Sequence, residues 1–133
     1  MIVADTNIIT YLFIEGDNTQ KAEEAFKKDA EWAAPILWRS EFRNVLAFYI
    51  RNQNLKLDKA IKIMNEATQL MDSNEYDVVS LDVLKLAEKS GCSAYDCEYI
   101  ALAQDLGIKL LTCDKKILKA FPDDTISLEN FIL

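Results

Sequence analysis

The order of apolar runs along this chain predicts an α/β fold, a three-layer α/β/α sandwich around a central, mostly parallel sheet. Short, nearly all-apolar segments alternate with longer segments in which apolar residues recur every three or four positions. Strands that read as continuous apolar runs are typical of parallel sheets covered on both faces. The chain has 133 residues and no internal repeat or Gly/Ser-rich linker, so we expect one domain over residues 1–133.

The first half of the chain is expected to contain two strands and four helices. In chain order these are a strand over 1–4, helices over 6–13 and 19–29, a strand over 32–34, and helices over 36–51 and 58–71. The turn Gly16-Asp17-Asn18 separates the first two helices. Pro35 is expected to stop the second strand, and Asp58 to cap the last of these helices.

The second half continues the alternation of strands and helices. We expect, in chain order, a strand over 76–79, helices over 81–89 and 93–107, a strand over 108–112, a short helix ending near Phe121, and a strand over 125–127. Gly91 and Gly107 follow the two longer helices, which is the usual place for a glycine just past a helix C-terminus.

Composition removes several kinds of chemistry. The chain has no histidine, which excludes Ser-His-Asp triads, Cys-His dyads and zinc sites with imidazole ligands. Its three cysteines, Cys92, Cys97 and Cys113, are expected to be reduced structural thiols. No apolar run approaches the roughly 20 residues that span a bilayer, and the N-terminus has no signal-peptide pattern. We therefore expect a cytoplasmic protein whose catalysis, if any, uses carboxylates, hydroxyls, lysines or a bound ion.

Four acidic residues stand where an α/β fold places a site. Asp5 ends the first strand, and Asp114 follows the strand over 108–112 by two residues. In open parallel sheets, ligands bind beyond the carboxyl ends of the strands. Asp96 lies in the first turn of its helix, and Glu41 lies among the apolar positions of the helix over 36–51, where burial of a carboxylate is costly without a partner.

Three of these acids also have purely structural interpretations. Asp114 is a good N-cap for the short helix after it. Ser93 and Asp96 have the spacing of a capping box. Glu41 could pair with a lysine or arginine of a neighbouring helix. Asp5, directly after an apolar strand, is more typical of a functional position.

Four segments that carry these acids resemble the motifs of the PIN-domain family, in order and over the whole chain. They are Val3-Ala4-Asp5-Thr6-Asn7-Ile8, the region of Glu41, Ala94-Tyr95-Asp96-Cys97-Glu98-Tyr99-Ile100-Ala101-Leu102-Ala103, and Leu110-Leu111-Thr112-Cys113-Asp114-Lys115. Within that family, a chain of this length without an added domain is similar to the VapC-type toxins.

The resemblance implies a divalent-metal-dependent endoribonuclease, the toxin of a VapBC-type pair. Asp5, Glu41, Asp96 and Asp114 would hold Mg²⁺ or Mn²⁺ and form the catalytic site, some through water. Asn7, Thr112 and Thr6 would support the pocket, and Glu98 is a further neighbouring candidate. Oxygen ligands suit hard cations, and a metal-bound water can act as the nucleophile where histidine is absent.

The resemblance also implies an RNA substrate, a cognate antitoxin protein and a homodimer, and no membrane. The net charge of −7 argues against general nucleic-acid binding but suits a basic partner. Candidate contacts to RNA are few and each has a surface or core alternative: Arg39, Arg43, Lys115, Lys116, Trp32, Trp38 and Tyr95. Some members of that family carry a further acid or Asn shortly after the Asp114 position, but here Lys115, Lys116 and Ile117 follow, which favours loose binding at that ligand.

Other classes fit less well. A haloacid-dehalogenase-like phosphatase needs Asp-x-Asp, but the third place here is Asn7. A receiver domain needs an acidic pair near the first strand, which is also missing. The remaining alternative is a catalytically silent PIN-like scaffold that binds RNA or a protein without cutting.

Overall fold

A five-stranded sheet forms the centre of the protein. The computed structural model describes all 133 residues, and the strand order is β3-β2-β1-β4-β5. The strands are β1 (Ile2–Ala4), β2 (Trp32–Pro35), β3 (Glu75–Tyr76), β4 (Leu110–Thr112) and β5 (Thr125–Ser127). Every neighbouring pair is parallel. The sheet expected to be mostly parallel is therefore wholly parallel.

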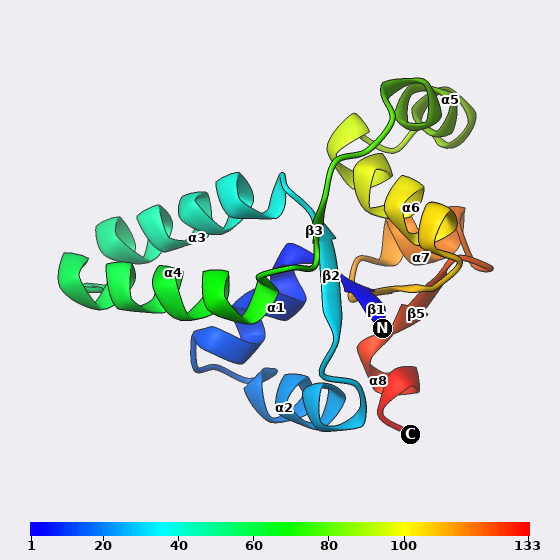
Figure 1. Cartoon of the computed structure of the whole chain (residues 1–133). Coiled ribbons are helices and arrows are strands. Elements are labelled where there is room, and N and C mark those ends of the chain that lie inside the picture. Colours follow the sequence, from blue (N-terminus) through cyan, green and yellow to red (C-terminus); the bar gives the residue numbers. More distant parts are fainter.

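Helices cover both faces of this sheet. They are α1 (Thr6–Phe13), α2 (Thr19–Lys28), α3 (Trp38–Asn52), α4 (Leu57–Met71), α5 (Ser80–Ser90), α6 (Ala94–Leu106), α7 (Lys115–Ala120) and α8 (Leu128–Phe131). Figure 1 shows α1, α3 and α4 on one side of the sheet and α5, α6 and α7 on the other. α2 packs against α1 and α8. The expected three-layer α/β/α sandwich is confirmed.

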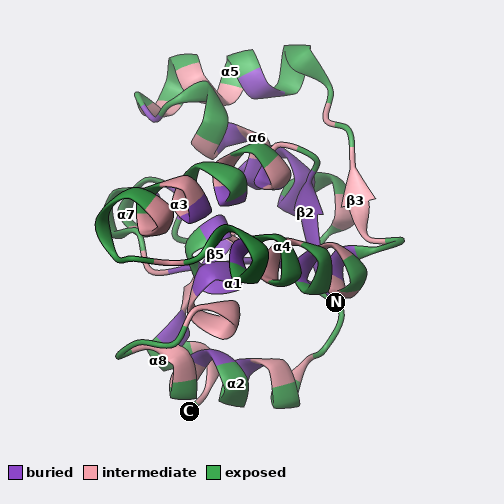
Figure 2. Ribbon diagram, turned by 90° about the vertical axis from the view of Figure 1, so that its left-hand side faces the viewer, coloured by how far each residue is buried: buried purple, intermediate pink, exposed green.

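The core lies around the three central strands. All residues of β1, β2 and β4 are buried, which is why these segments read as unbroken apolar runs. Figure 2 shows the contrast between buried β2 and α5, much of which is exposed. Cys92 and Cys97 are buried free thiols, and Cys113 is a half-buried one, as the sequence predicts. No helix has the length and apolar character that a membrane crossing requires.

Several element boundaries match their predictions. α1 and β5 begin and end at the expected residues. Gly91 and Gly107 follow α5 and α6 with φ of +73° and +67°, the left-handed conformation that favours glycine at this place.

Other predicted boundaries are wrong for physical reasons that the structure makes clear. α3 begins at Trp38 and not at Ile36, because the Ile36 N–H donates to the Tyr76 carbonyl at 3.0 Å and stays with the sheet. The strand expected over 76–79 is only Glu75–Tyr76, since β2 ends at Pro35 and offers no partner beyond it.

Two further corrections concern helix ends. Asp58 does not cap α4, which begins one residue earlier; its Oδ1 accepts a hydrogen bond from the Lys59 N–H at 2.9 Å. α8 was not predicted. It is a single short turn that Ser127 caps by accepting from the Asn130 N–H at 3.2 Å. Its four residues carry too little periodicity to reveal it.

A polar cluster ties the start of α3 to β3. The guanidinium of Arg39 donates to both carboxylate oxygens of Glu75, at 2.5 and 2.6 Å, and the Trp38 indole N–H donates to Glu75 Oε2 at 2.7 Å. Bidentate hydrogen bonds between a guanidinium and a carboxylate are stronger than hydrogen bonds between neutral groups. Arg39 is thus engaged with Glu75 and is not free to contact a phosphate, the role that the sequence left open for it.

Glu75→Gln is expected to lower the free energy of unfolding by about 1–3 kcal/mol, the usual range for hydrogen bonds to charged groups. Arg39 holds the pKa of Glu75 below its usual value. The variant should therefore show its full destabilisation above the ordinary glutamate pKa of about 4.3. The destabilisation should shrink as the pH falls through the lowered pKa of Glu75, because the wild type then loses the ion pair as well. Urea unfolding across pH would measure it. Glu66→Gln, at an exposed position of α4, is the control. Equal stability of the two variants at pH 7 would contradict the expectation.

Candidate active site

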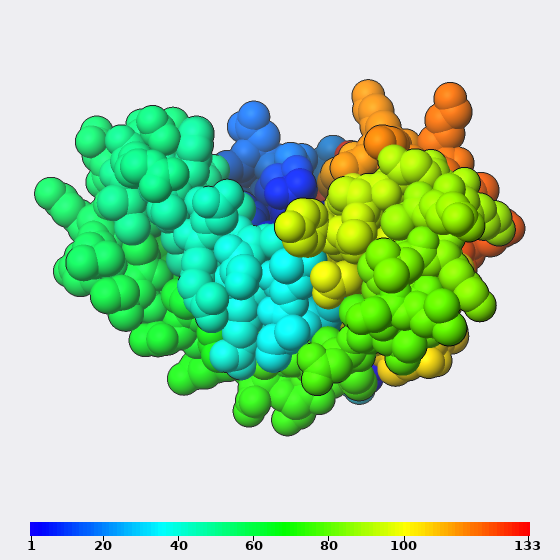
Figure 3. Space-filling view, turned by 90° about the horizontal axis from the view of Figure 1, so that it is seen from above, coloured from blue at the N-terminus to red at the C-terminus, as the bar shows by residue number.

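The candidate site lies where β1 and β4 end side by side. The chain leaves β1 into helices on one face of the sheet and leaves β4 into α7 on the other face. Such a switch point opens a crevice beyond the carboxyl ends of the strands. Figure 3 looks down on this edge and shows the N-terminal segment (blue) in a recess between the α3 side and the α6 side.

Asp5 lies at the centre of this edge. Its N–H donates to the Leu111 carbonyl at 3.1 Å, which continues the pairing of β1 with β4 and sets Asp5 beside Thr112. The Thr112 hydroxyl donates to Asp5 Oδ2 at 2.7 Å. Asp5 is therefore held in place by backbone pairing and by the Thr112 hydroxyl.

Burial raises the pKa of Asp5 to about 6. The hydrogen bond from Thr112 and the nearby Asn7 N–H oppose this rise, whereas the negative charges of Glu41 and Asp96 add to it. Three predicted site residues, one directly after β1 and the others on α3 and α6, are thus near enough for their charges to interact. A buried carboxylate among like charges is typical of a functional site.

Glu41 is fixed by two hydroxyl groups. The Tyr99 hydroxyl donates to Glu41 Oε1 at 2.6 Å, and the Thr6 hydroxyl lies 2.9 Å from the same oxygen and 2.5 Å from the Tyr99 oxygen. Thr6 and Tyr99 are both buried, and Tyr99 is 3% exposed. The lysine or arginine partner considered for Glu41 is not present, because the three ion pairs of the chain involve other residues.

Asp96 and Glu98 bring α6 to the same edge. Ser93 caps α6 by accepting from the Asp96 N–H at 3.0 Å, which is half of a capping box. The half-buried Asp96 side chain lies near enough to Asp5 for their charges to interact. Burial raises the pKa of Glu98, and the charge of Glu41 raises it further.

Asp114 is used differently from the other three acids. It is exposed and caps α7, because its Oδ1 accepts from the N–H groups of Lys116 and Ile117 at 2.9 and 3.1 Å. Its own N–H donates to the Thr112 hydroxyl at 3.1 Å, so Thr112 links Asp114 to Asp5. Nowhere do three or more acidic or cysteine side chains meet closely enough to hold a metal ion. The structure therefore does not gather the four predicted ligands into one preformed cluster.

The remaining predicted residues lie around this edge with varying roles. The Asn7 side chain is exposed, and only its backbone N–H lies near Asp5. Trp32 and Trp38 are fully buried core residues, while Tyr95 is 62% exposed. Lys116 Nζ donates to the Gly91 carbonyl at 3.3 Å. Arg43 and Lys115 are exposed and form no ion pair.

Tyr99 is the site residue whose role the sequence did not reveal. A signal existed: Tyr99 lies three positions after Asp96, and residues at this spacing share one face of a helix. Only the packing of α6 against the start of α1 and α3 brings its hydroxyl to Glu41.

Comparison with known proteins agrees with this geometry. The family model of the PIN domain matches residues 2–122. Ribonuclease VapC3 of Pyrobaculum aerophilum is 31% identical over 124 residues, which are 91% of this chain and 95% of that protein.

Two solved structures share the fold at low sequence identity. FitAcB from Neisseria gonorrhoeae has a TM-score of 0.77 at 14% identity, covering 97% of this chain and 99% of its own. A toxin–antitoxin complex from Klebsiella pneumoniae has a TM-score of 0.70 at 16% identity, covering 96% of this chain and 98% of its own. With the family model matching most of its length, the chain belongs to the PIN domain family, as a VapC-type member.

Proposed function

We propose that this protein is a divalent-metal-dependent endoribonuclease and the toxin of a VapBC-type toxin–antitoxin pair. The observation that carries the proposal is the placement of Asp5, Glu41 and Asp96 at one edge of the sheet, where Thr112 holds Asp5 and Thr6 and Tyr99 hold Glu41. Ion pairs do not neutralise these carboxylates. The 31% identity to Ribonuclease VapC3 supports RNA as the substrate.

The donor set at this edge fits Mg²⁺ or Mn²⁺. The side chains are carboxylates and hydroxyls without histidine, and hard cations prefer oxygen ligands. Mg²⁺ commonly keeps several waters and binds one or two carboxylates directly, so a preformed cage of three is not required. Asp5, Glu41 and Asp96 would hold the ion, directly or through water, and Asp114 would join through water.

The reaction proposed is hydrolysis of an RNA phosphodiester that leaves a 5′-phosphate and a 3′-hydroxyl. A bound divalent ion would lower the pKa of an attacking water and stabilise charge on the phosphate. The chain's own groups set the geometry. Thr112 orients Asp5 through its Oδ2, and Thr6 with Tyr99 orients Glu41 through its Oε1.

The proposed partners follow from the same likenesses. A cognate antitoxin is supported by the toxin–antitoxin complex that shares the fold, and the charge of −7 suits a basic partner segment. We further propose that the protein works as a homodimer in the cytoplasm.

One observation favours a second candidate, a catalytically silent PIN scaffold that binds RNA or a protein. The acids do not form a cluster of three or more with metal-binding geometry. A scaffold would bind its partner without a divalent ion, and substitution of the acids would leave that binding intact.

Removal of the metal distinguishes a nuclease from a catalytically silent scaffold. Wild-type protein should cut a labelled RNA panel in Mg²⁺ or Mn²⁺ and lose this activity in EDTA. Asp96→Asn, purified identically, should cut at least about a hundredfold more slowly, because even the loss of a residue that only supports a metal ligand costs 10–100-fold. Equal cutting by both proteins would indicate a contaminating nuclease. No cutting and no metal binding by either would support the scaffold.

A further inference from the structure

A pocket of about 320 Å³ opens beside the acidic residues, between the end of β2, the β3–α5 loop, α5 and α6. Its walls include Ile36, Val78 and Leu84, and Glu98 closes one side. Glu98 lies near enough to Glu41 for their charges to interact, so the pocket adjoins the candidate active site. The volume is at the small end of the range for ligand sites, about 300–1,000 Å³, and suits one planar ring system.

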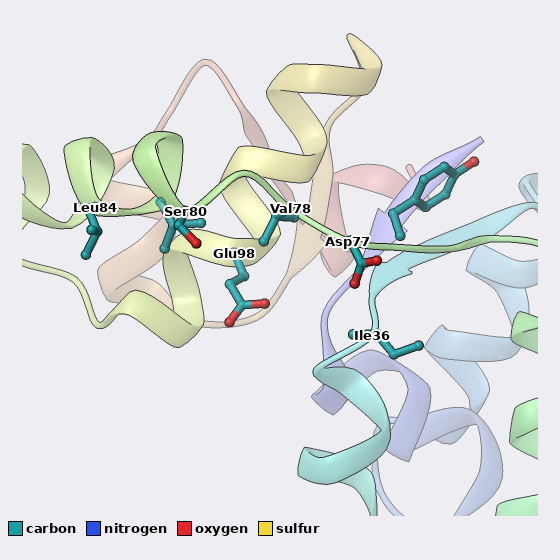
Figure 4. Close-up of a pocket in the computed structure, with 8 residues that line it drawn as sticks. Ile36, Asp77, Val78, Ser80, Leu84 and Glu98 are labelled. Atoms are coloured by element: carbon teal, nitrogen blue, oxygen red, sulfur yellow. The ribbon is translucent and has the colours of Figure 1, made fainter.

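The pocket combines apolar walls with acceptors. Ile36 is 50% exposed and Leu84 is 63% exposed, so apolar surface remains there for a ligand to cover. Figure 4 shows the carboxylates of Glu98 and Asp77 directed toward the space beside Ile36. The hydrogen bond from the Ile36 N–H to the Tyr76 carbonyl fixes this wall to the sheet.

We propose that this pocket binds an unpaired guanine of the RNA next to the scissile phosphate, with Glu98 accepting hydrogen bonds from its Watson–Crick edge. The inference rests on the proposed nuclease function and specifies its substrate. The bound base would lie between Ile36 and Leu84, which supply apolar contact to its faces.

Guanine is singled out by the chemistry of its edge. An ionised carboxylate only accepts hydrogen bonds. Guanine presents two adjacent donors, N1–H and the N2 amino group, which match the two oxygens of one carboxylate. Adenine and cytosine present a single amino donor beside an acceptor nitrogen, and uracil presents one N–H between two carbonyls. These three edges therefore place an acceptor against Glu98 or Asp77.

The test uses short fluorescent oligouridines that carry one central G, A or C, or no substitution. Binding is measured by anisotropy in Ca²⁺, with a gel to verify intact RNA, and cutting is measured in Mn²⁺. The wild type should prefer the G probe over the others by roughly 5- to 150-fold, since a two-pronged base contact is worth about 1–3 kcal/mol of discrimination.

Glu98→Gln should move the preference from G to A and C. Glutamine offers one acceptor and one donor, which complement the amino group and the adjacent ring nitrogen that adenine and cytosine share. Glu88→Gln, an exposed position of α5 outside the pocket, is the matched control and should keep the preference for G. A general distortion of the site would instead weaken all four probes alike, so the switch is specific to base recognition.

Each result decides between the two proposals. Cutting without a preference for G, or a Glu98→Gln variant that retains it, would overturn the guanine pocket and leave the nuclease in place. A preference for G in binding without any cutting would support the pocket and overturn the nuclease. Loss of antitoxin binding by Glu98→Gln, without a change in base preference, would assign the pocket to a cationic side chain of a protein partner instead.

Discussion

Asp5→Asn is expected to abolish RNA cleavage and, at the same time, to stabilise the metal-free protein at neutral pH. The two effects have one cause. The Asp5 carboxylate is buried beside Glu41 and Asp96, which is costly unless a cation is bound. Asparagine keeps the size and an acceptor for the Thr112 hydroxyl but carries no charge. Cutting should fall by about 10²–10³ or more, the loss typical of removing a key charge-stabilising group.

The pH dependence of the stability gain follows from the raised pKa. Folded Asp5 has a pKa of about 6, against an ordinary value of 3.8. Above pH 6 the carboxylate is ionised in both states, and its burial costs the folded state about 3 kcal/mol. Below about pH 4 it is protonated in both states and the cost disappears. The stability difference between variant and wild type should thus be largest at pH 7–8 and shrink steadily toward pH 4.

Urea unfolding of the two proteins in EDTA, at several pH values, measures this difference. Asp17→Asn, in the exposed turn after α1, is the control and should change neither stability nor cutting. Added Mn²⁺ should stabilise the wild type but not Asp5→Asn, because only a state that binds the ligand is stabilised by it. A destabilised Asp5→Asn variant at pH 7 would show that Asp5 has a mainly structural role.

The acids at this edge are therefore expected to weaken the metal-free fold. The structure offsets part of the cost with hydroxyl donors, from Thr112 to Asp5 and from Thr6 and Tyr99 to Glu41. These donors do not neutralise the charges. Residual repulsion at the switch point is the expected property of a site completed by a cation.

The parallel sheet and most helices could be predicted because their signals are local or periodic. The segments that became β1, β2 and β4 are continuous apolar runs, and buried parallel strands require such runs. The glycines after α5 and α6 mark helix ends through their backbone conformation. Asp5 could be assigned to the site because a residue directly after a central strand of a parallel sheet lies at its carboxyl edge.

Features that depend on tertiary contacts could not be predicted in this way. β3 stops at Tyr76 because its neighbour β2 stops at Pro35, and no property of the segment 77–79 reports this. Asp114 could be expected as a cap or as a ligand, and only the structure shows its Oδ1 bound to two N–H groups of α7. The engagement of Arg39 by Glu75 likewise joins residues 36 positions apart.

Tyr99→Phe is expected to weaken Mn²⁺ binding and RNA cleavage by about 10–100-fold, the usual effect of removing a group that orients a metal ligand. Burial and the neighbouring Glu41 raise the pKa of Tyr99 above its usual value, so the hydroxyl stays protonated and always donates. Without this donor, Glu41 Oε1 keeps only Thr6 and can rotate away from the recess. Phenylalanine retains the ring in the core, so the fold should persist.

Isothermal titration with Mn²⁺ shows whether Tyr99→Phe impairs the orientation of Glu41 or the folding of the protein. Unfolding in EDTA should show a loss of about 1 kcal/mol, the value of one hydrogen bond, which cannot account for a 10–100-fold change in a folded protein. Tyr95→Phe, on the exposed side of the same helix, should bind Mn²⁺ and cut like the wild type. If Tyr99→Phe also binds Mn²⁺ with wild-type affinity, then Glu41 needs no hydroxyl to hold it, and Tyr99 serves only the packing of α6.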